Sequence, residues 1–176
     1  MSSDTQVFYV SGDISRTKDL VERFQKGFYA FCPAAGKIPA AYGNLYQIPD
    51  IGNLVEFNIL LNKALAEHVQ QNKINVIVVD VLSEVLLRHR ALMTRKWFSE
   101  FVGKRKAQNF TIFSTLNPLI VSKEETDRVA DVFDGVIEIY EKQDTQGRVR
   151  RFLVVRKMYG QKYSETELMI DKNKLF

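Results

Sequence analysis

The apolar run Val76–Val79 leads without interruption into a single carboxylate, Asp80. Three valines and an isoleucine favour extended backbone, and a run with no polar face is typical of a parallel strand buried on both sides. Because parallel strands need crossover connections, this run constrains the chain to an α/β fold. Asp80 then stands at the carboxyl end of the strand, where open α/β sheets form their ligand crevice.

Periodicity places strands and helices in alternation around this run. We predict strands at 7–11, 28–32, 44–48, 75–82 and 110–116, and helices at 16–25, 53–65, 94–106 and 122–133. Strands at 135–141, 151–158 and 167–170 follow, with Gly147 in a turn, while 34–41 is ambiguous. The fold class expected is three-layer α/β, with a doubly wound, mostly parallel sheet and an antiparallel C-terminal extension. We expect one domain over residues 1–176.

Two of the predicted helices begin with capping boxes. Asn53 is followed three residues later by Glu56, and Ser122 is followed in the same way by Glu125. The side chain of the first residue accepts a hydrogen bond from the backbone of the second, so each pair marks a helix start.

Composition limits the compartment and the partners. Hydrophobic residues make up 45% of the chain and charged residues 26%, and there is one cysteine, so we expect a cytoplasmic protein with no internal disulfide. No apolar run approaches the ~20 residues that span a bilayer, which argues against a membrane partner. The formal net charge is +4, but residues 86–106 hold seven Lys or Arg against one acid, whereas 122–141 hold seven acids against two bases. These segments are either solvated helix faces or a polarised surface for self-association or nucleic acid.

A resemblance to a known family now enters. The order of elements, the strand ending in Asp80 and the segment 156–160 (RKMYG) resemble the RecA-type P-loop ATPases, in particular the archaeal KaiC-like branch. The similarity of pattern extends from Val7 to about Asp171. It implies a RecA-like sheet, a phosphate-binding loop after the first strand, and Asp80 as the Mg²⁺ ligand when Mg²⁺ binds.

The phosphate-binding loop that this resemblance implies is degenerate. Its pattern is G-x-x-x-x-G-K-[ST], and residues 12–19 read GDISRTKD, so only Gly12 and Lys18 match. Thr17 brings a β-branched side chain to a glycine position, and Asp19 replaces the hydroxyl residue with a negative charge close to the phosphates. The alternative is an ordinary strand-to-helix turn in which Asp13 or Ser15 caps the helix.

Other positions of the family pattern are also altered or open to a second interpretation. The resemblance places Thr115 and Asn117 where relatives sense the γ-phosphate, although Asn-Pro also suits a turn. Relatives carry a catalytic glutamate after the second strand, where this chain has Cys32-Pro33, and Glu84 is either a substitute or an exposed loop residue. Asp80 itself could instead cap the turn that follows it.

A family segment K-x-R-G reaches into the phosphate site of the neighbouring subunit. Here the lysine is kept as Lys157, but the arginine is Tyr159. A tyrosine cannot stabilise phosphoryl charge as a guanidinium does. The alternative is an amphipathic edge strand.

Three functions compete. The first is a non-catalytic RecA/KaiC-like domain that acts as a regulatory or assembly module, with no cofactor expected and at most weak binding of Mg-ATP. The second is a weak nucleotide-binding ATPase that uses Lys18 and Asp80. The third is a nucleic-acid-binding accessory factor that uses the basic helix. Self-association or another protein is the expected partner. Head-to-tail contact would join basic C-terminal strands to the acidic helix 122–133 and would weaken in salt.

Overall fold

The computed structural model describes residues 4–33, 43–48, 50, 52–144 and 146–170, so the ambiguous segment 34–41 lies outside the described residues. The chain divides into two compact units, residues 1–129 and 130–176, and each has its own sheet. The assignment of all 176 residues to one domain stays a prediction.

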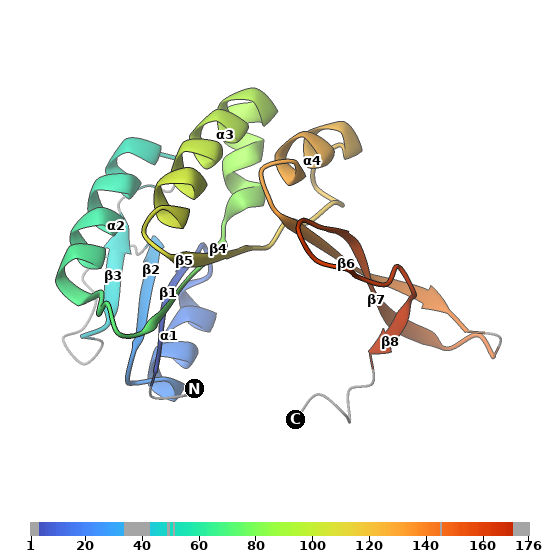
Figure 1. Ribbon diagram of the computed structural model, residues 1–176, viewed down its shortest axis with the longest axis horizontal. Helices are drawn as coiled ribbons and strands as arrows, with labels where there is room; N and C mark the ends of the chain where they lie inside the picture. Colours follow the sequence, from blue (N-terminus) through green and yellow to red (C-terminus); the bar gives the residue numbers. More distant parts are fainter. Residues whose placement is uncertain (1–3, 34–42, 49, 51, 145, 171–176) are drawn as a thin grey trace. The chain divides into compact units, whose positions relative to one another are not determined.

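The first unit contains an open parallel sheet with helices on both faces (Figure 1). Its elements in chain order are β1 (Thr5–Ser11), α1 (Ile14–Arg23), β2 (Phe28–Pro33), β3 (Leu45–Ile48), α2 (Leu54–His68), β4 (Ile74–Asp80), α3 (Leu82–Lys106), β5 (Phe110–Ser114) and α4 (Lys123–Ala130), which ends at the boundary between the units. The strand order is β3-β2-β1-β4-β5, and all four pairings are parallel. The prediction of a doubly wound, mostly parallel α/β sheet is therefore confirmed.

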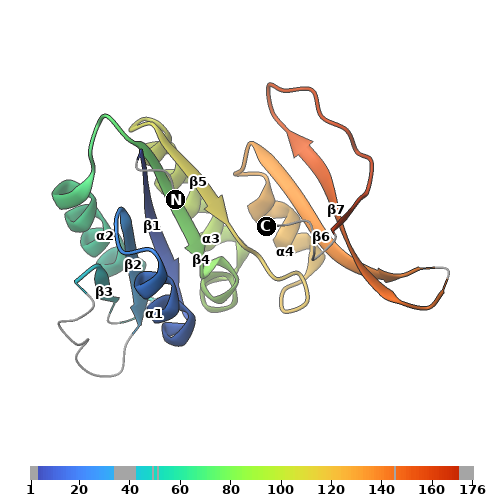
Figure 2. The same ribbon diagram turned by 90° about the horizontal axis from the view of Figure 1, so that it is seen from below.

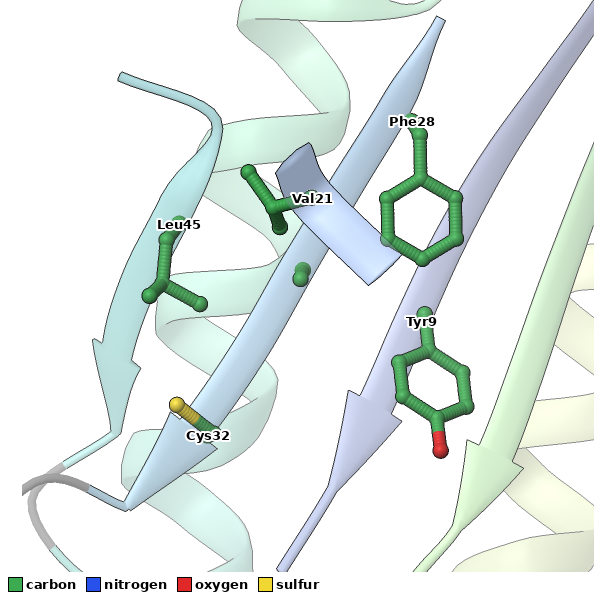
Figure 3. Close-up of a cluster of buried hydrophobic side chains, with 6 residues drawn as sticks. Tyr9, Val21, Phe28, Cys32 and Leu45 are labelled. Atoms are coloured by element: carbon green, nitrogen blue, oxygen red, sulfur yellow. The ribbon is translucent and has the colours of Figure 1, made fainter. Parts of the chain in front are cut away.

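Figure 2 shows α1 on one face of this sheet and α2 with α3 on the other. On the α1 face, Val21 of the helix packs against Tyr9, Phe28 and Leu45 (Figure 3). On the other face the sheet places side chains that are fully buried, among them Ile77 and Val79 of β4, each 0% exposed. This packing of helix stripes onto alternate strand residues buries the α2/α3 face of the central strands and part of the α1 face.

The burial of β4 differs from the sequence-based expectation. Asn75, Ile77 and Val79 are buried on the α2/α3 face, but Val76 and Val78 are only half-buried. The run of β-branched residues predicts the strand correctly, yet a single helix, α1, is too small to cover the whole of the opposite face. The strand also ends at Asp80, two residues earlier than predicted, because Leu82 already begins α3.

The helix caps are largely as predicted. Asn53 Oδ1 accepts a hydrogen bond from Glu56 N (3.1 Å) at the start of α2. In return, the side-chain amide nitrogen of Asn53 donates to the Glu56 carboxylate (3.2 Å). At α4, Ser122 Oγ accepts from Glu125 N (3.2 Å), and Glu125 accepts from Ser122 N (3.3 Å), which forms a full capping box.

Helix α3 is longer than predicted and is kinked. The sequence analysis begins this helix at residue 94, whereas the structure begins it at Leu82. At Arg90 the backbone leaves the helical region, with φ 58° and ψ 169°, a conformation that costs a non-glycine residue of order 1–3 kcal/mol. The kink interrupts the apolar periodicity, which explains why pattern analysis finds only the second half of the helix.

The second unit is a three-stranded antiparallel sheet. Its strands are β6 (Gly135–Gln143), β7 (Val149–Met158) and β8 (Leu168–Ile170), in the order β6-β7-β8. Gly147, at φ 76°, lies in the turn between the first two strands. The antiparallel C-terminal extension is therefore confirmed, as a sheet of its own.

None of the helices in the described part of the chain is both long and apolar enough to cross a membrane.

Candidate functional site

The topological switch point of the first unit lies at the carboxyl ends of β1 and β4. From β1 the chain passes through α1 to β2 on one side, while β4 pairs with β1 on the other side. The strand order therefore reverses between β1 and β4, and ligands of open α/β sheets bind at such a switch point. Because Ser11 and Asp80 are register partners, the residues that follow these two strands meet here.

Asp80 is the centre of a polar cluster at this switch point. The Tyr9 hydroxyl donates to Asp80 Oδ2 at 2.7 Å, the Thr115 hydroxyl donates to Oδ1, and Arg16 Nη1 lies 3.6 Å from Oδ2. Burial raises the pKa of Tyr9, and the negative charge of Asp80 raises it further, so the phenol stays a hydrogen-bond donor at neutral pH. Both oxygens of Asp80 are thus engaged by side chains of this chain.

The loop after β1 forms a capped turn. Asp13 Oδ1 accepts a hydrogen bond from Arg16 N at 3.0 Å and so caps α1. Thr17 is fully buried, and its hydroxyl donates to the Asp13 carbonyl oxygen at 2.5 Å. The structure therefore has the strand-to-helix turn with Asp13 as N-cap that was one of the two interpretations of residues 12–19.

A second carboxylate lies over the same loop. Glu84 comes from the first turn of α3, and its side-chain oxygens occupy the space that a Cβ on Gly12 would fill. A Cβ at residue 12 would meet the end of the Glu84 side chain, so the close approach depends on Gly12. Glu84 is an exposed residue in the first turn of α3, and its carboxylate and that of Asp13 both lie beside the loop that leads into α1, where a helix N-terminus would otherwise attract phosphate.

Arg16, which the motif comparison does not select, is the base that approaches Asp80. Residues two apart on a helix point about 200° away from each other, so Arg16 and Lys18 face different sides of α1. The positive charge of Lys18 lies close enough to Cys32, at the end of β2, to oppose the rise that burial causes in the pKa of that thiol. In the sequence, Arg16 could have been identified from its position three residues after the N-cap, Asp13. Asp19 is exposed.

Of the two predicted γ-phosphate sensors, only Thr115 makes a described contact with Asp80. Asn117 N donates to Ser83 Oγ at 2.8 Å, and Asn117 Oδ1 accepts from Leu119 N at 3.0 Å. The latter bond is an Asx turn, which is the alternative that the Asn-Pro dipeptide suggests.

Comparison with known proteins identifies the family. A sequence model described as "ATPase: KaiC" matches residues 56–173, which is well over half of the chain. The chain belongs to the KaiC family of ATPases. The match does not extend to residues 12–19. Among solved structures, the chain is similar to the KaiC-like protein PH0186 from the hyperthermophilic archaeon Pyrococcus horikoshii OT3, with a TM-score of 0.53 and 13% identity over 96% of this chain and 86% of that one. At this identity the likeness shows the fold. No curated protein gives a significant match.

Lys157 and Tyr159, which the sequence resemblance matches to a K-x-R-G segment, lie at and just after the end of β7. The Lys157 ammonium lies 5.7 Å from the centre of the Tyr159 ring, and Tyr159 N donates to the Asp134 carbonyl oxygen at 2.7 Å. The Tyr159 side chain is 75% exposed. Within the second unit, these two residues therefore form a cation–π pair at the end of the strand.

The charges that we expected to drive head-to-tail assembly are largely paired within their own elements. In the second unit three arginines are paired with acids of the same hairpin: Arg150 with Asp144 (3.2 Å), Arg151 with Glu141 (2.8 Å) and Arg156 with Glu138 (2.6 Å). On α4, two ion pairs link residues four apart: Lys123 with Asp127 (2.7 Å) and Arg128 with Glu124 (2.5 Å). Such pairing reduces the field that each patch presents to a second copy.

The aromatic side chains of the basic helix α3 pack toward the interior of the first unit. Trp97 and Phe101 both contact Phe57 of α2, with ring centres 5.9 and 6.4 Å apart. Arg105 is 3% exposed and donates to Asn62 and Gln108. These rings are not available as stacking platforms for bases, as the sequence pattern already indicates.

Proposed function

We propose that this KaiC-family chain does not hydrolyse ATP and acts as an assembly or regulatory module. The observation that carries the proposal is that the N-terminus of α1 is capped by Asp13, while the carboxylate of Glu84 lies against Gly12 in the loop that leads into this helix. A phosphate group at this place would lose its hydrogen bond to the capped amide and would meet two negative charges.

Two further groups that ATP hydrolysis would need have no counterpart in the expected positions. The second strand ends in Cys32-Pro33, and the sequence has no acid between Pro33 and Asp50 that could activate water in the way the family resemblance implies. The phosphate-binding pattern also needs a glycine at position 17, where the backbone would approach the phosphate. This chain has Thr17 there, and its side chain is 0% exposed.

The two alternatives have less support. A weak ATPase that uses Lys18 and Asp80 needs both groups on one phosphate chain, but both carboxylate oxygens of Asp80 are already engaged, by Tyr9, Thr115 and Arg16. A nucleic-acid-binding role would depend on the basic side chains of α3 alone, because the aromatic rings pack inward.

Calorimetric titration with Mg-ATP and an assay of phosphate release test the proposal. We expect no hydrolysis above buffer and no micromolar affinity. Micromolar affinity that disappears in Lys18→Ala, but persists in the control Lys26→Ala on the exposed loop after α1, would overturn the proposal in favour of the weak ATPase.

A gain-of-function variant tests the physical reason. Asp13→Asn keeps an N-cap acceptor, and Glu84→Gln keeps the shape of the side chain, so the double variant D13N/E84Q removes two charges and little else. We expect it to bind inorganic phosphate measurably where the wild type does not. If both proteins bind phosphate equally, the two carboxylates are not what excludes the anion. The control is D19N, which removes an exposed charge from the same helix.

A further inference from the structure

The last residue of α2, His68, contacts aromatic rings from two strands of the first unit. Its imidazole stacks on the Tyr29 ring of β2, with ring centres 4.4 Å apart and an angle of 17° between the planes. At its edge, the Nε2 atom of His68 is hydrogen-bonded to the hydroxyl of Tyr46 on β3. The ring of Tyr46 stacks in turn on Phe31 of β2, with ring centres 5.1 Å apart. One imidazole therefore connects the end of a helix to two neighbouring strands.

A buried glutamine fixes the backbone at this end of α2. Gln6 of β1 is 1% exposed, and its side-chain nitrogen donates to the carbonyl oxygen of His68 at 2.8 Å. The side-chain oxygen of Gln6 accepts from the backbone N–H of Gln70, also at 2.8 Å. Both ends of this amide hold the chain where the helix stops. The main chain of His68 is thus fixed, and only its imidazole is able to change partners.

The Nε2 atom of His68 has two neighbours of opposite chemistry. The Tyr46 hydroxyl is at hydrogen-bond distance, whereas Glu67 Oε2 lies 3.9 Å away. Burial, and after it the charge of Glu67, raises the pKa of Tyr46, so the phenol keeps its proton and is able to donate it. An unprotonated nitrogen accepts such a bond and offers nothing to a carboxylate. The observed arrangement, with the phenol in contact and the carboxylate at a distance, is the one expected of a neutral imidazole.

Protonation reverses the preference of this nitrogen. Once Nε2 carries a proton it is a charged donor, and a carboxylate accepts from a charged donor more strongly than a phenol does. The C-terminal end of α2 also favours a positive charge. The stack on Tyr29 survives the change, because a cation is attracted to the face of an aromatic ring. Among the described residues, the titratable groups that face this imidazole are Tyr29 of β2, Tyr46 of β3 and Glu67 of α2.

We propose that His68 is a pH-dependent latch for strand β3. The neutral imidazole accepts from Tyr46 and joins β3 to the end of α2, whereas the protonated imidazole donates to Glu67 and releases Tyr46. Strand β3 has four residues and is the last in the strand order, so it is the strand of this sheet that local opening detaches most easily. Imidazole is the side chain that ordinarily changes charge between pH 5 and 8, which makes the latch responsive near neutral pH.

The latch goes beyond the proposed function and does not depend on it. It involves α2, β2 and β3, whereas Asp80 ends β4. Phosphate release tests the absence of ATPase activity, and the protection of β3 tests the latch. Either result stands whatever the outcome of the other.

Nitrogen-15 NMR of the imidazole tests the starting state. At about pH 8 we expect His68 to be the tautomer with its proton on Nδ1, because Nε2 accepts from Tyr46. The chain has two histidines, so the variant His89→Asn identifies the signals of His68 and keeps a side-chain donor at position 89. A proton on Nε2 at this pH overturns the proposal, since that nitrogen would then already be a donor.

Amide hydrogen exchange tests the release of the strand. We expect the protection factors of β3, corrected for the intrinsic effect of pH, to fall by about tenfold from about pH 7.5 to about pH 5.5, because uptake of one proton permits at most a tenfold change per pH unit. Amides of β4, in the interior of the same sheet, are the internal control and should fall less. Equal protection of β3 at both pH values overturns the latch.

Three variants test the exchange of partners. Tyr46→Phe removes the hydroxyl and keeps the ring that stacks on Phe31, so we expect β3 to be weakly protected at both pH values. Glu67→Gln removes the charged partner, so the pH response should become smaller. The control Glu22→Gln, at an exposed position on α1, should respond as the wild type does. A full pH response in Tyr46→Phe, or a wild-type response in Glu67→Gln, contradicts the proposal.

Discussion

The two sheets of this chain are stabilised by different interactions. In the first unit, side chains such as Phe8, Ile77 and Phe98 are 0% exposed, whereas Val154 is the one buried hydrophobic residue among the described residues of the second unit. Ion pairs occur in both units, but the second unit, which is much shorter, has few buried apolar side chains beside them. Four link residues within the second unit: Arg150 with Asp144, Arg151 with Glu141, Arg156 with Glu138 and Lys142 with Glu167.

This contrast teaches where the folding free energy lies. Burial of a large apolar side chain contributes about 1.5–3 kcal/mol, while an exposed ion pair contributes about 0–1 kcal/mol. The first unit is therefore the thermodynamic core of the chain. The second unit is a three-stranded sheet whose cross-strand charges specify register and solubility more than they stabilise it.

The largest expected effect is in the core of the first unit. Phe98→Ala on α3 removes a fully buried ring that stacks on Phe101, with ring centres 5.6 Å apart. We expect the free energy of unfolding in urea to fall by about 3–5 kcal/mol. The control Leu92→Ala, at a 74% exposed position on the same helix, should change it by less than about 0.5 kcal/mol. Equal losses of unfolding free energy in the two variants would contradict the conclusion that buried side chains stabilise the first unit.

Two glycines should respond with opposite signs. Gly147 has φ 76° in the β6–β7 turn, so Gly147→Ala should destabilise the hairpin by about 1–2 kcal/mol, measured by amide hydrogen exchange in β6. Gly103 lies inside α3 with open space where its Cβ would be, so Gly103→Ala should stabilise the first unit by about 0.5–1 kcal/mol in urea unfolding. If both substitutions changed stability in the same direction, backbone conformation would not explain the effects at these two glycines.

The smallest expected effect is in the charges of the second unit. A double-mutant cycle on Arg151→Ala and Glu141→Ala should give a coupling free energy of about 0.2–1 kcal/mol, because both side chains are about half exposed. The coupling should decrease in 1 M salt, where the Debye length is about 3 Å. A coupling free energy that does not change with salt would contradict the view that exposed ion pairs are a main interaction of the second unit.

The sequence predicts those parts of the fold that depend on local pattern. The β-branched run before Asp80, the cap residues Asn53 and Ser122, and the alternation of elements all have short-range signals, and the structure confirms them. Strand neighbours follow from the right-handed crossover rule once the elements are known.

The site is less predictable because it depends on where helices begin. Helix α1 begins at Ile14 rather than at residue 16, and the side chain of Arg16, near its start, approaches Asp80. Moving the start of α3 from residue 94 to Leu82 brings Glu84 onto the loop of Gly12. Neither shift leaves a periodic signal, because Arg90 interrupts α3 and α1 is short.

The position of Glu84 over Gly12 has a consequence for the evolution of this switch point. Asp13 and Glu84 each place a negative charge beside the start of α1, so the loss of one leaves the other to oppose an anion. A lineage that acquired phosphate binding here would have to change two positions that belong to separate segments of the chain.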